Sequence, residues 1–195
     1  MYESTVVFIR RLRILSWFLF VKWFFKKISF GSYIYKPTSL SGLRFVSIGR
    51  KTGISDGAWI MVDNSISQNV AVTIGDNNYI GRYLHLICFN KVFIGNNVLI
   101  ADKVYISDNI HNYQDVSKPI KEQGISIRGA VEIGDGAWIG ENVSIIGAKI
   151  GKGSVISANA VVLSDIPDFC VAGGIPAKII KKYNFETASW ERIDQ

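Results

Sequence analysis

A repeat of six residues constrains the fold of this chain more than any other feature. An aliphatic side chain returns at every sixth position, with short slips between blocks, and glycine often follows it. The repeated aliphatic positions are Ile48, Ile54, Ile60, Ile66, Ile74, Ile80, Leu86, Ile94, Ile100, Ile106, Ile127, Ile133, Ile139, Ile145, Ile150, Ile156 and Val162. This period matches neither the 3.6-residue turn of an α-helix nor simple strand alternation. It predicts very short strands joined by tight corners.

Three such units make a triangular coil, and stacked coils make a solenoid with a continuous aliphatic interior. Gly, Asn and Asp between the aliphatic positions suit the corners, because they tolerate the backbone dihedral angles of tight turns. At about 18 residues per coil, roughly five to six coils fit between Phe45 and Val162. The predicted fold class is therefore mainly β, a parallel β-helix.

We expect three regions along the 195 residues. A basic, aromatic N-terminal helix occupies residues 1–36, the β-helix occupies 37–166, and a short tail occupies 167–195. An excursion over residues 107–126 interrupts the β-helix, since the repeat stops there. Hydrophobic residues at 48% and charged residues at 19% exclude a disordered chain. Two cysteines and two histidines argue against a disulfide scaffold and a metal centre, so we expect no metal.

The positive charge is concentrated at the N-terminus. The net charge is +6, and the first thirty residues carry six basic side chains against one acid, Glu3. A nucleic-acid-binding protein would spread basic residues over its folded surface. We therefore expect no nucleic-acid partner.

Residues 6–30 combine aromatic and basic side chains without a Pro or Gly, which predicts a helix. The longest stretch without charge, Ile14–Val21, is eight residues, whereas a membrane span needs about twenty. No small-residue cleavage site marks a signal peptide. Two interpretations stay open: a helix lying in an anionic membrane interface with Trp17 and Trp23 at headgroup level, or a helix packed on the body or on another subunit. The expected location is the cytoplasm, and the first interpretation would add peripheral contact at the inner face of the cytoplasmic membrane.

The excursion carries His111, one of the two histidines. Long excursions from a regular solenoid are costly to order and usually functional. A neutral imidazole, with a reference pKa of about 6.5, suits removal of a proton from a hydroxyl near neutral pH. An activated acyl thioester would need no serine or cysteine nucleophile, and Cys88 and Cys170 lie in apolar contexts typical of core positions.

The hexads resemble those of the left-handed β-helix acyltransferases. The stretches VFIGNNVLIADKVYISDNIHNY, PIKEQG, VEIGDGAWIGENVSI and GGIPAKIIKKYNFETASWERI are similar to O-acetyltransferases of bacterial surface polysaccharides, such as lipopolysaccharide O-antigen or capsule. The resemblance covers about residues 45–195. It implies the left hand of the coil, acetyl-CoA as donor, and a homotrimer with active sites between subunits.

The resemblance also implies roles for single residues. The loop of such relatives usually reads Ser-Asp-His-x-His with the second His as general base, which here is His111, while Asn109 replaces the first His. Asp108, Glu122 or a backbone carbonyl would orient the ring. Candidate acceptor-binding residues are Tyr83, His85, Asn90, Asp108 and Asn109. Candidate cofactor-binding residues are Trp138, Gly140, Gly147, Ala158, Lys178 and Lys181.

The predicted function is acetyl-CoA-dependent O-acetylation of a sugar hydroxyl on a surface polysaccharide or its lipid-linked precursor, by direct transfer. Two alternatives stay open. One is N-acetylation of an amino sugar in a nucleotide-sugar pathway, although such enzymes often carry an extra domain before the solenoid. The other is an inactive solenoid scaffold, against which His111 and the Pro176-Ala177-Lys178 motif argue.

Overall fold

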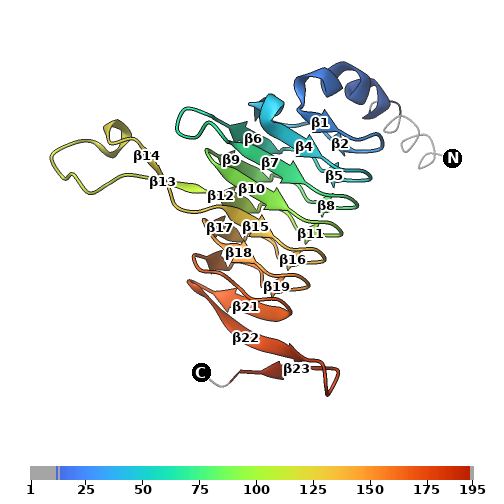
Figure 1. The fold of residues 1–195 in the computed structure, drawn as a ribbon, viewed down its shortest axis with the longest axis vertical. Coiled ribbons are helices and arrows are strands. Elements are labelled where there is room, and N and C mark those ends of the chain that lie inside the picture. Colours follow the sequence, from blue (N-terminus) through green and yellow to red (C-terminus); the bar gives the residue numbers. More distant parts are fainter. Residues whose placement is uncertain (1–11, 13, 194–195) are drawn as a thin grey trace.

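The structure, a computed structural model, is a parallel β-helix with three sheets (Figure 1). It describes residues 12 and 14–193. In this part of the chain each of six coils gives one strand to each of three sheets, which we call A, B and C. Every strand within a coil therefore pairs in parallel with the equivalent strand of the next coil.

Sheet A contains β1 (Lys27–Ile28), β4 (Val46–Ile48), β7 (Ala71–Ile74), β10 (Lys91–Ile94), β15 (Val131–Ile133) and β18 (Lys149–Ile150). Sheet B contains β2 (Tyr33–Ile34), β5 (Gly53–Ile54), β8 (Tyr79–Ile80), β11 (Leu99–Ile100), β16 (Trp138–Ile139), β19 (Val155–Ile156), β21 (Cys170–Gly174), β22 (Ala177–Asn184) and β23 (Ser189–Arg192). Sheet C contains β3 (Ser39–Ser41), β6 (Trp59–Val62), β9 (His85–Cys88), β12 (Tyr105–Ser107), β17 (Ser144–Ile146) and β20 (Val161–Val162).

The aliphatic residue of each hexad points into the coil and stacks on its equivalents. In sheet B the inward residues Ile54, Ile80, Ile100 and Ile139 are fully buried and adjacent in register. Their neighbours along each strand face outward, as the two-residue alternation of a strand requires. Each two-residue strand of sheet B thus has one inward residue, whereas the longer strands β4, β7, β10 and β15 of sheet A each bury two.

Polar side chains close the corner between sheets A and B from inside. The hydroxyl of Thr52 donates to the carbonyl of Gly75 at 2.7 Å and accepts the backbone N–H of Asn78 at 3.1 Å. The amide of Asn78 donates to the carbonyl of Gly95 and accepts the N–H of Val98. Both side chains are buried, and these bonds satisfy corner backbone groups that strand pairing leaves free.

Asparagine occupies corner positions with positive φ. Asn77 and Asn97 have φ of 58° and 56°, and the amide of Asn77 donates to the side-chain oxygen of Asn97 at 2.7 Å. Asn142 and Asn159 repeat the arrangement at the next corner along, with a bond of 2.9 Å. Asn tolerates this left-handed conformation better than most residues, so these corners select it.

The β-helix begins at Lys27, ten residues before the expected boundary at 37. Ile34 is 1% exposed in β2 and stacks beside Ile54. Ile28, Ile34 and Leu40 already follow the six-residue period, which is the signal that marks this first coil.

Two of the counted hexad positions do not point inward. Ile66 is 44% exposed in the loop between β6 and β7, and Val62 fills the interior instead. Ile127 lies in β14 (Ile125–Ile127), outside the coil, and the repeat resumes with Val131 and Ile133. The prediction of an inward side chain was wrong at these two positions, since isoleucines outside the coils matched the six-residue period by chance.

A helical segment covers the N-terminal end of the β-helix (Figure 1). Residues 14–21 are α-helical and continue into the 3-10 helix η1 (Lys22–Phe24). Trp17 and Val21 pack against the core, and Phe25 is buried in it. The helix predicted over residues 6–30 is thus present at residues 14–24, and the prediction is wrong beyond them, where β1 begins at Lys27. Residues 1–11 and 13 lie outside the described residues.

The C-terminal tail ends the stack differently. β21 pairs in parallel with β19, after which β22 and β23 turn back as antiparallel strands on the same sheet. Phe169, Tyr183, Phe185 and Trp190 form a chain of edge-to-face ring contacts along it, with centroids 5.0–5.3 Å apart. The sequence predicted a tail without assigning it to a sheet.

Ile100→Ala should lower the free energy of unfolding by about 2–5 kcal/mol, because it leaves a cavity in the middle of the stacked interior. Ile66→Ala is the matched control, since the same atoms are removed from an exposed loop, and its cost should stay within about 0.5 kcal/mol. Urea unfolding at one fixed protein concentration measures both. Equal losses for the two variants would contradict the assignment of inward positions.

Candidate active site between two corners

The excursion forms a two-stranded arm that projects from the corner between sheets C and A (Figure 1). Its strands are β13 (Asn109–His111) and β14, which pair antiparallel with His111 opposite Ile125. Strand β10 of the coil before the arm pairs directly with β15 of the coil after it. The arm therefore leaves and re-enters the solenoid without interrupting the stacking, from Asp108 to residue 130.

The arm tip is ordered by its own hydrogen bonds. The Gln123 amide donates to the carbonyls of Asp115 and Lys118 at 2.8 and 3.0 Å, and its oxygen accepts the backbone N–H of Asp115. The amide of Asn112 donates to the Gln123 carbonyl at 2.9 Å. A 3-10 turn, η3 (Ile120–Glu122), precedes Gln123. One glutamine thus closes the tip without help from the coils.

Asp108 fixes the base of the arm. Its carboxylate is fully buried and accepts the backbone N–H groups of Phe89, Asn90 and Lys91 at 2.9, 2.7 and 2.8 Å. The side chain of Asn109 donates to it at 3.0 Å. These charge-assisted bonds tie the arm to the corner of the preceding coil. Asp108 is a positioning residue, because none of its surface reaches solvent.

His111 presents an exposed imidazole on the arm. Among the described residues, neither Asp108 nor Glu122 forms a hydrogen bond with it, so the expected orienting carboxylates do not contact the ring within this chain. The ring is therefore free to receive a hydroxyl group or a contact from another subunit.

The candidate acceptor residues fall into two separate groups. Asn90, Asp108 and Asn109 lie together at the base of the arm, where the Asn90 side chain also accepts a bond from Ser67 at 3.2 Å. Tyr83 lies at the opposite end of β9, in the corner between sheets B and C, with φ of 57°. Tyr83 and Asn90, both candidates for acceptor binding, therefore lie at opposite ends of β9.

His85 belongs to an aromatic row on the outer face of sheet C. Its ring stacks on Trp59 with centroids 4.4 Å apart and an angle of 13°, and Tyr105 contacts it at 5.1 Å. Its Nε2 atom is buried without a hydrogen-bond partner in the described structure. Burial lowers the pKa of His85 below its ordinary value of 6.5. The outer face of sheet C thus carries a row of packed aromatic rings in which burial favours the neutral form of the His85 imidazole.

Both cysteine thiols stay protonated near neutral pH. Burial raises the pKa of the Cys88 thiol, and the neighbouring Asp108 carboxylate raises it further. Burial also raises the pKa of Cys170. A thiol is a weak nucleophile compared with its thiolate, so neither residue suits covalent catalysis.

Two of the six candidate cofactor residues, Gly140 and Ala158, lie in a different corner, the one between sheets B and C. Gly140 packs on Ala158 so closely that a Cβ there would come 2.5 Å from the Ala158 nitrogen. Ser157 in the same corner packs on Gly173, which pairs with Lys178 across β21 and β22. The small residues of this corner therefore extend from Gly140 to Gly173, which lies next to Lys178 of the C-terminal tail.

Trp138 and Lys181 lie on sheet B beside this corner. Trp138 is 50% exposed on β16. Lys181 of β22 pairs with Val171 of β21, which is two strands from β16 in the sheet. Gly147 lies elsewhere: it has φ of 57° and packs against Arg128 at the base of the arm. The structure therefore separates Gly147 from the other candidate cofactor residues. Gly147 lies in the corner after strand β17 of sheet C, whereas Gly140 lies in the corner before that strand.

The imidazole and the small-residue corner do not meet within one chain. His111 extends from the corner between sheets C and A, whereas Gly140 and Ala158 lie in the corner between B and C. All of sheet C lies between them. A second subunit that places its B–C corner beside this arm would complete the site.

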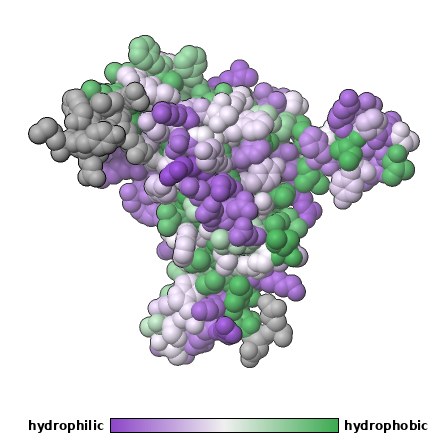
Figure 2. All heavy atoms as spheres, turned by 180° about the vertical axis from the view of Figure 1, so that it is seen from behind, coloured by the Kyte–Doolittle hydropathy of each residue, from purple (hydrophilic) through white to green (hydrophobic). Residues whose placement is uncertain are grey.

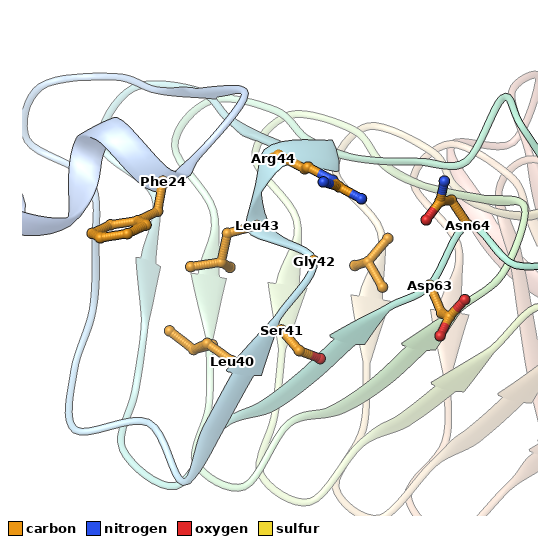
Figure 3. Close-up of a pocket in the computed structure, with 9 residues that line it drawn as sticks. Phe24, Leu40, Ser41, Gly42, Leu43, Arg44, Asp63 and Asn64 are labelled. Carbon is orange, nitrogen blue, oxygen red and sulfur yellow. The ribbon is translucent and has the colours of Figure 1, made fainter.

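A surface hollow of about 510 Å³ was not expected from the sequence. It lies where sheets C and A meet, near the N-terminal end (Figure 3). Phe24, Leu40 and Leu43 line one side, and Arg44, Asp63 and Asn64 line the other (Figure 3). The signal in the sequence was the slip of the repeat between Ile66 and Ile74, which lies in and just after the loop that follows Val62.

Comparison with curated proteins finds named acetyltransferases. The chain is 42% identical over 128 residues to WbbJ of Escherichia coli K12, named for O-acetyl transfer in lipopolysaccharide biosynthesis, covering 62% of this chain and 65% of WbbJ. It is 33% identical over 154 residues to the galactoside O-acetyltransferase of the same organism, covering 78% of this chain and 71% of that protein. An acetyltransferase of Mycobacterium tuberculosis is 40% identical over 148 residues, covering 75% of this chain and 46% of its own length. The chain thus spans less than two thirds of WbbJ and of the mycobacterial protein.

Comparison with solved structures supports the fold. AntD, an N-acyltransferase from Bacillus cereus in complex with dTDP and 3-hydroxybutyryl-CoA, superposes with a TM-score of 0.69 at 19% identity, covering 85% of this chain and 87% of AntD. No family model matches the chain. The parallel β-helix expected from the hexads, with the left hand that the resemblance implies, is confirmed.

The lowered pKa of His85 predicts a pH dependence of stability. The unfolded chain binds this proton near pH 6.5, more readily than the folded protein does. The contribution of His85 to stability is therefore fully present above about pH 6.5, and the free energy of unfolding should fall as the pH drops through that value. His85→Phe keeps a ring between Trp59 and Tyr105 but cannot titrate. Its urea stability should change less between about pH 7.5 and about pH 5.5. If the free energy of unfolding of His85→Phe changed with pH as steeply as that of the wild type, His85 would not be the origin of the pH dependence.

Proposed function

This chain belongs to the hexapeptide-repeat acetyltransferases, and on that premise we propose that it transfers an acetyl group from acetyl-CoA to a sugar hydroxyl of a bacterial surface polysaccharide or its precursor. The observation that carries the proposal is the exposed imidazole of His111 on an arm held by a buried carboxylate. The similarity to WbbJ and to a galactoside O-acetyltransferase supports a sugar hydroxyl as the acceptor.

The reaction needs one base and a few donors. The unprotonated nitrogen of His111 removes the proton of the hydroxyl as its oxygen attacks the thioester carbonyl. The tetrahedral intermediate collapses, the C–S bond breaks, and the imidazolium returns its proton to the leaving thiolate. A backbone N–H group suffices to stabilise the oxyanion. No group on the enzyme is acylated, in agreement with the protonated state of both cysteines.

The donor fits the corner between sheets B and C. Gly140 is buried and lets the two coils pack closely, and the small exposed Ala158 leaves room on the surface of this corner for an extended pantetheine arm. The exposed Lys178 offers a charge for coenzyme phosphates. Trp138 offers an exposed ring face on the neighbouring sheet. These placements support a donor site that runs along the coils toward the tail.

We propose a homotrimer, with each arm completing the donor corner of a neighbour. Two apolar surfaces support this arrangement. Tyr79, Leu99 and Trp138 form an exposed row on sheet B, and Tyr113 and Val116 are exposed on the arm. Contacts between subunits would cover such surfaces. The acceptor would then bind between the arm base of one subunit and the donor corner of the next.

His111→Ala should lower turnover by roughly 10²–10⁴-fold, the usual contribution of a positioned general base. Its folding should be unaffected, because the side chain is exposed on the arm. Lys121→Ala, at another exposed position of the same arm, is the matched control and should retain turnover within about twofold. Acetyl transfer is measured with sugars bearing free hydroxyl or free amino groups. Full activity of the His111 variant, or transfer to amines alone, would overturn the proposal.

A site shared by two subunits predicts complementation between inactive variants. His111→Ala removes the base, and Ala158→Trp blocks the donor corner at an exposed position. In trimers reassembled from equal amounts of the two, about one quarter of the sites combine an intact arm with an intact donor corner. Activity should therefore rise to about a quarter of the wild-type value after mixing. No recovery in verified mixed trimers would place both groups in one subunit.

A further inference from the structure

The N-terminal segment exposes more apolar surface than its packing requires. Its outward side chains, here called the cap surface, are Leu12, Leu15, Leu19, Phe20, Trp23, Phe24 and Phe30. Trp23 is 80% exposed and Phe20 is 78% exposed. Figure 2 shows hydrophobic side chains gathered at this end of the molecule. Isolated exposed apolar residues are ordinary, but a contiguous group of this kind marks a contact surface.

The cap surface is distinct from the face of the helix that builds the fold. Trp17 and Val21 already pack against the interior of the first coil, and Phe25 is buried. Leu15, Leu19 and Trp23 follow a spacing of four residues and so lie on a different side of the helical segment. The helix is therefore apolar on two sides, and only one of them is used within the chain.

The charged side chains of the segment that carries the cap surface have one sign. Lys26 and Lys27 are exposed directly after the helical segment, and the Lys22 ammonium lies 4.7 Å from the ring centre of Trp23. Residues 12–36 contain no Asp or Glu. Apolar rings flanked by unopposed lysines are complementary to a surface with an apolar interior and an anionic boundary.

We propose that the cap surface docks on an anionic lipid bilayer. Phe20 and Trp23 would enter the boundary between headgroups and acyl chains, where indole rings are favoured, and the lysines would lie at the headgroups. Among the described residues, no helix has the length and hydropathy needed to cross a bilayer. The contact is therefore an interfacial one, at the end of the solenoid farthest from β23 (Figure 1).

A bilayer fits this surface better than a second copy of the chain. A two-fold contact through the cap would bring identical residues together, so Lys22, Lys26 and Lys27 would face lysines with no acid of this segment to pair with. Like charges at such a contact oppose association. Anionic headgroups instead supply the missing counter-charge.

Co-sedimentation of the full-length protein with vesicles tests the proposal. We expect binding to vesicles of phosphatidylcholine with phosphatidylglycerol, and little binding to phosphatidylcholine alone. The double variant Phe20→Ser/Trp23→Ser should bind at least about tenfold more weakly, because two exposed rings are lost. Each change of Lys22, Lys26 or Lys27 to Gln should weaken binding about fivefold at low salt.

Phe185→Ser is the matched control, since this ring is 68% exposed at the opposite end of the stack, and it should bind vesicles like the wild type. Thermal unfolding of every variant verifies that the fold is retained. The assay requires no turnover, so its result is independent of the proposed acetyl transfer. Absence of vesicle binding, or binding that is insensitive to anionic lipid, to salt and to the double variant, would overturn the proposal. Self-association that the double variant abolishes, without vesicle binding, would assign the surface to a second copy.

Discussion

Each coil of this protein depends on the coils beside it, because a single triangular turn cannot enclose its own aliphatic side chains. The inward residues of sheet B, such as Ile80 and Ile100, are buried only where the next coil lies directly on them in register. The corners obey the same constraint, since Thr52 and Asn78 bond to backbone groups of the following coil. Stability in such a stack accumulates through contacts between neighbours.

This constraint leaves little freedom for catalytic groups inside the solenoid, and the arm is the consequence. Strands β10 and β15 pair as if the arm were absent, so the chain carries a long insertion at no cost in stacking. Asp108 links the stacked coils to the arm, because its carboxylate accepts hydrogen bonds from the corner of one coil and its main chain starts the arm. An exposed histidine is thereby held by a buried carboxylate three residues earlier.

The six-residue period predicted the coils well because each inward position demands an aliphatic residue. It failed at Ile66 and Ile127, where a loop and the arm also carry isoleucine at the right spacing, and periodicity alone does not report burial. His111 was selected as a candidate because histidine is rare in this chain and this one lies in the segment that interrupts the repeat. The separation of Tyr83 from Asn90 was missed, since it depends on which corner each residue occupies. The anchoring role of Asp108 follows from three-dimensional contacts that no spacing encodes.

The two ends of the stack have a consequence for polymerisation. A parallel β-helix resembles a cut segment of a fibre, because each terminal coil offers unpaired strand edges to another molecule. Here the N-terminal coil is covered by the helical segment around Trp17. Past the last coil, sheet B continues into β22, which runs antiparallel to β21, and then into β23, which runs antiparallel to β22. Among the described residues, neither end therefore presents all three sheets of an uncovered coil to a further coil. These two endings thus make a finite particle from a repeat that would otherwise elongate without limit.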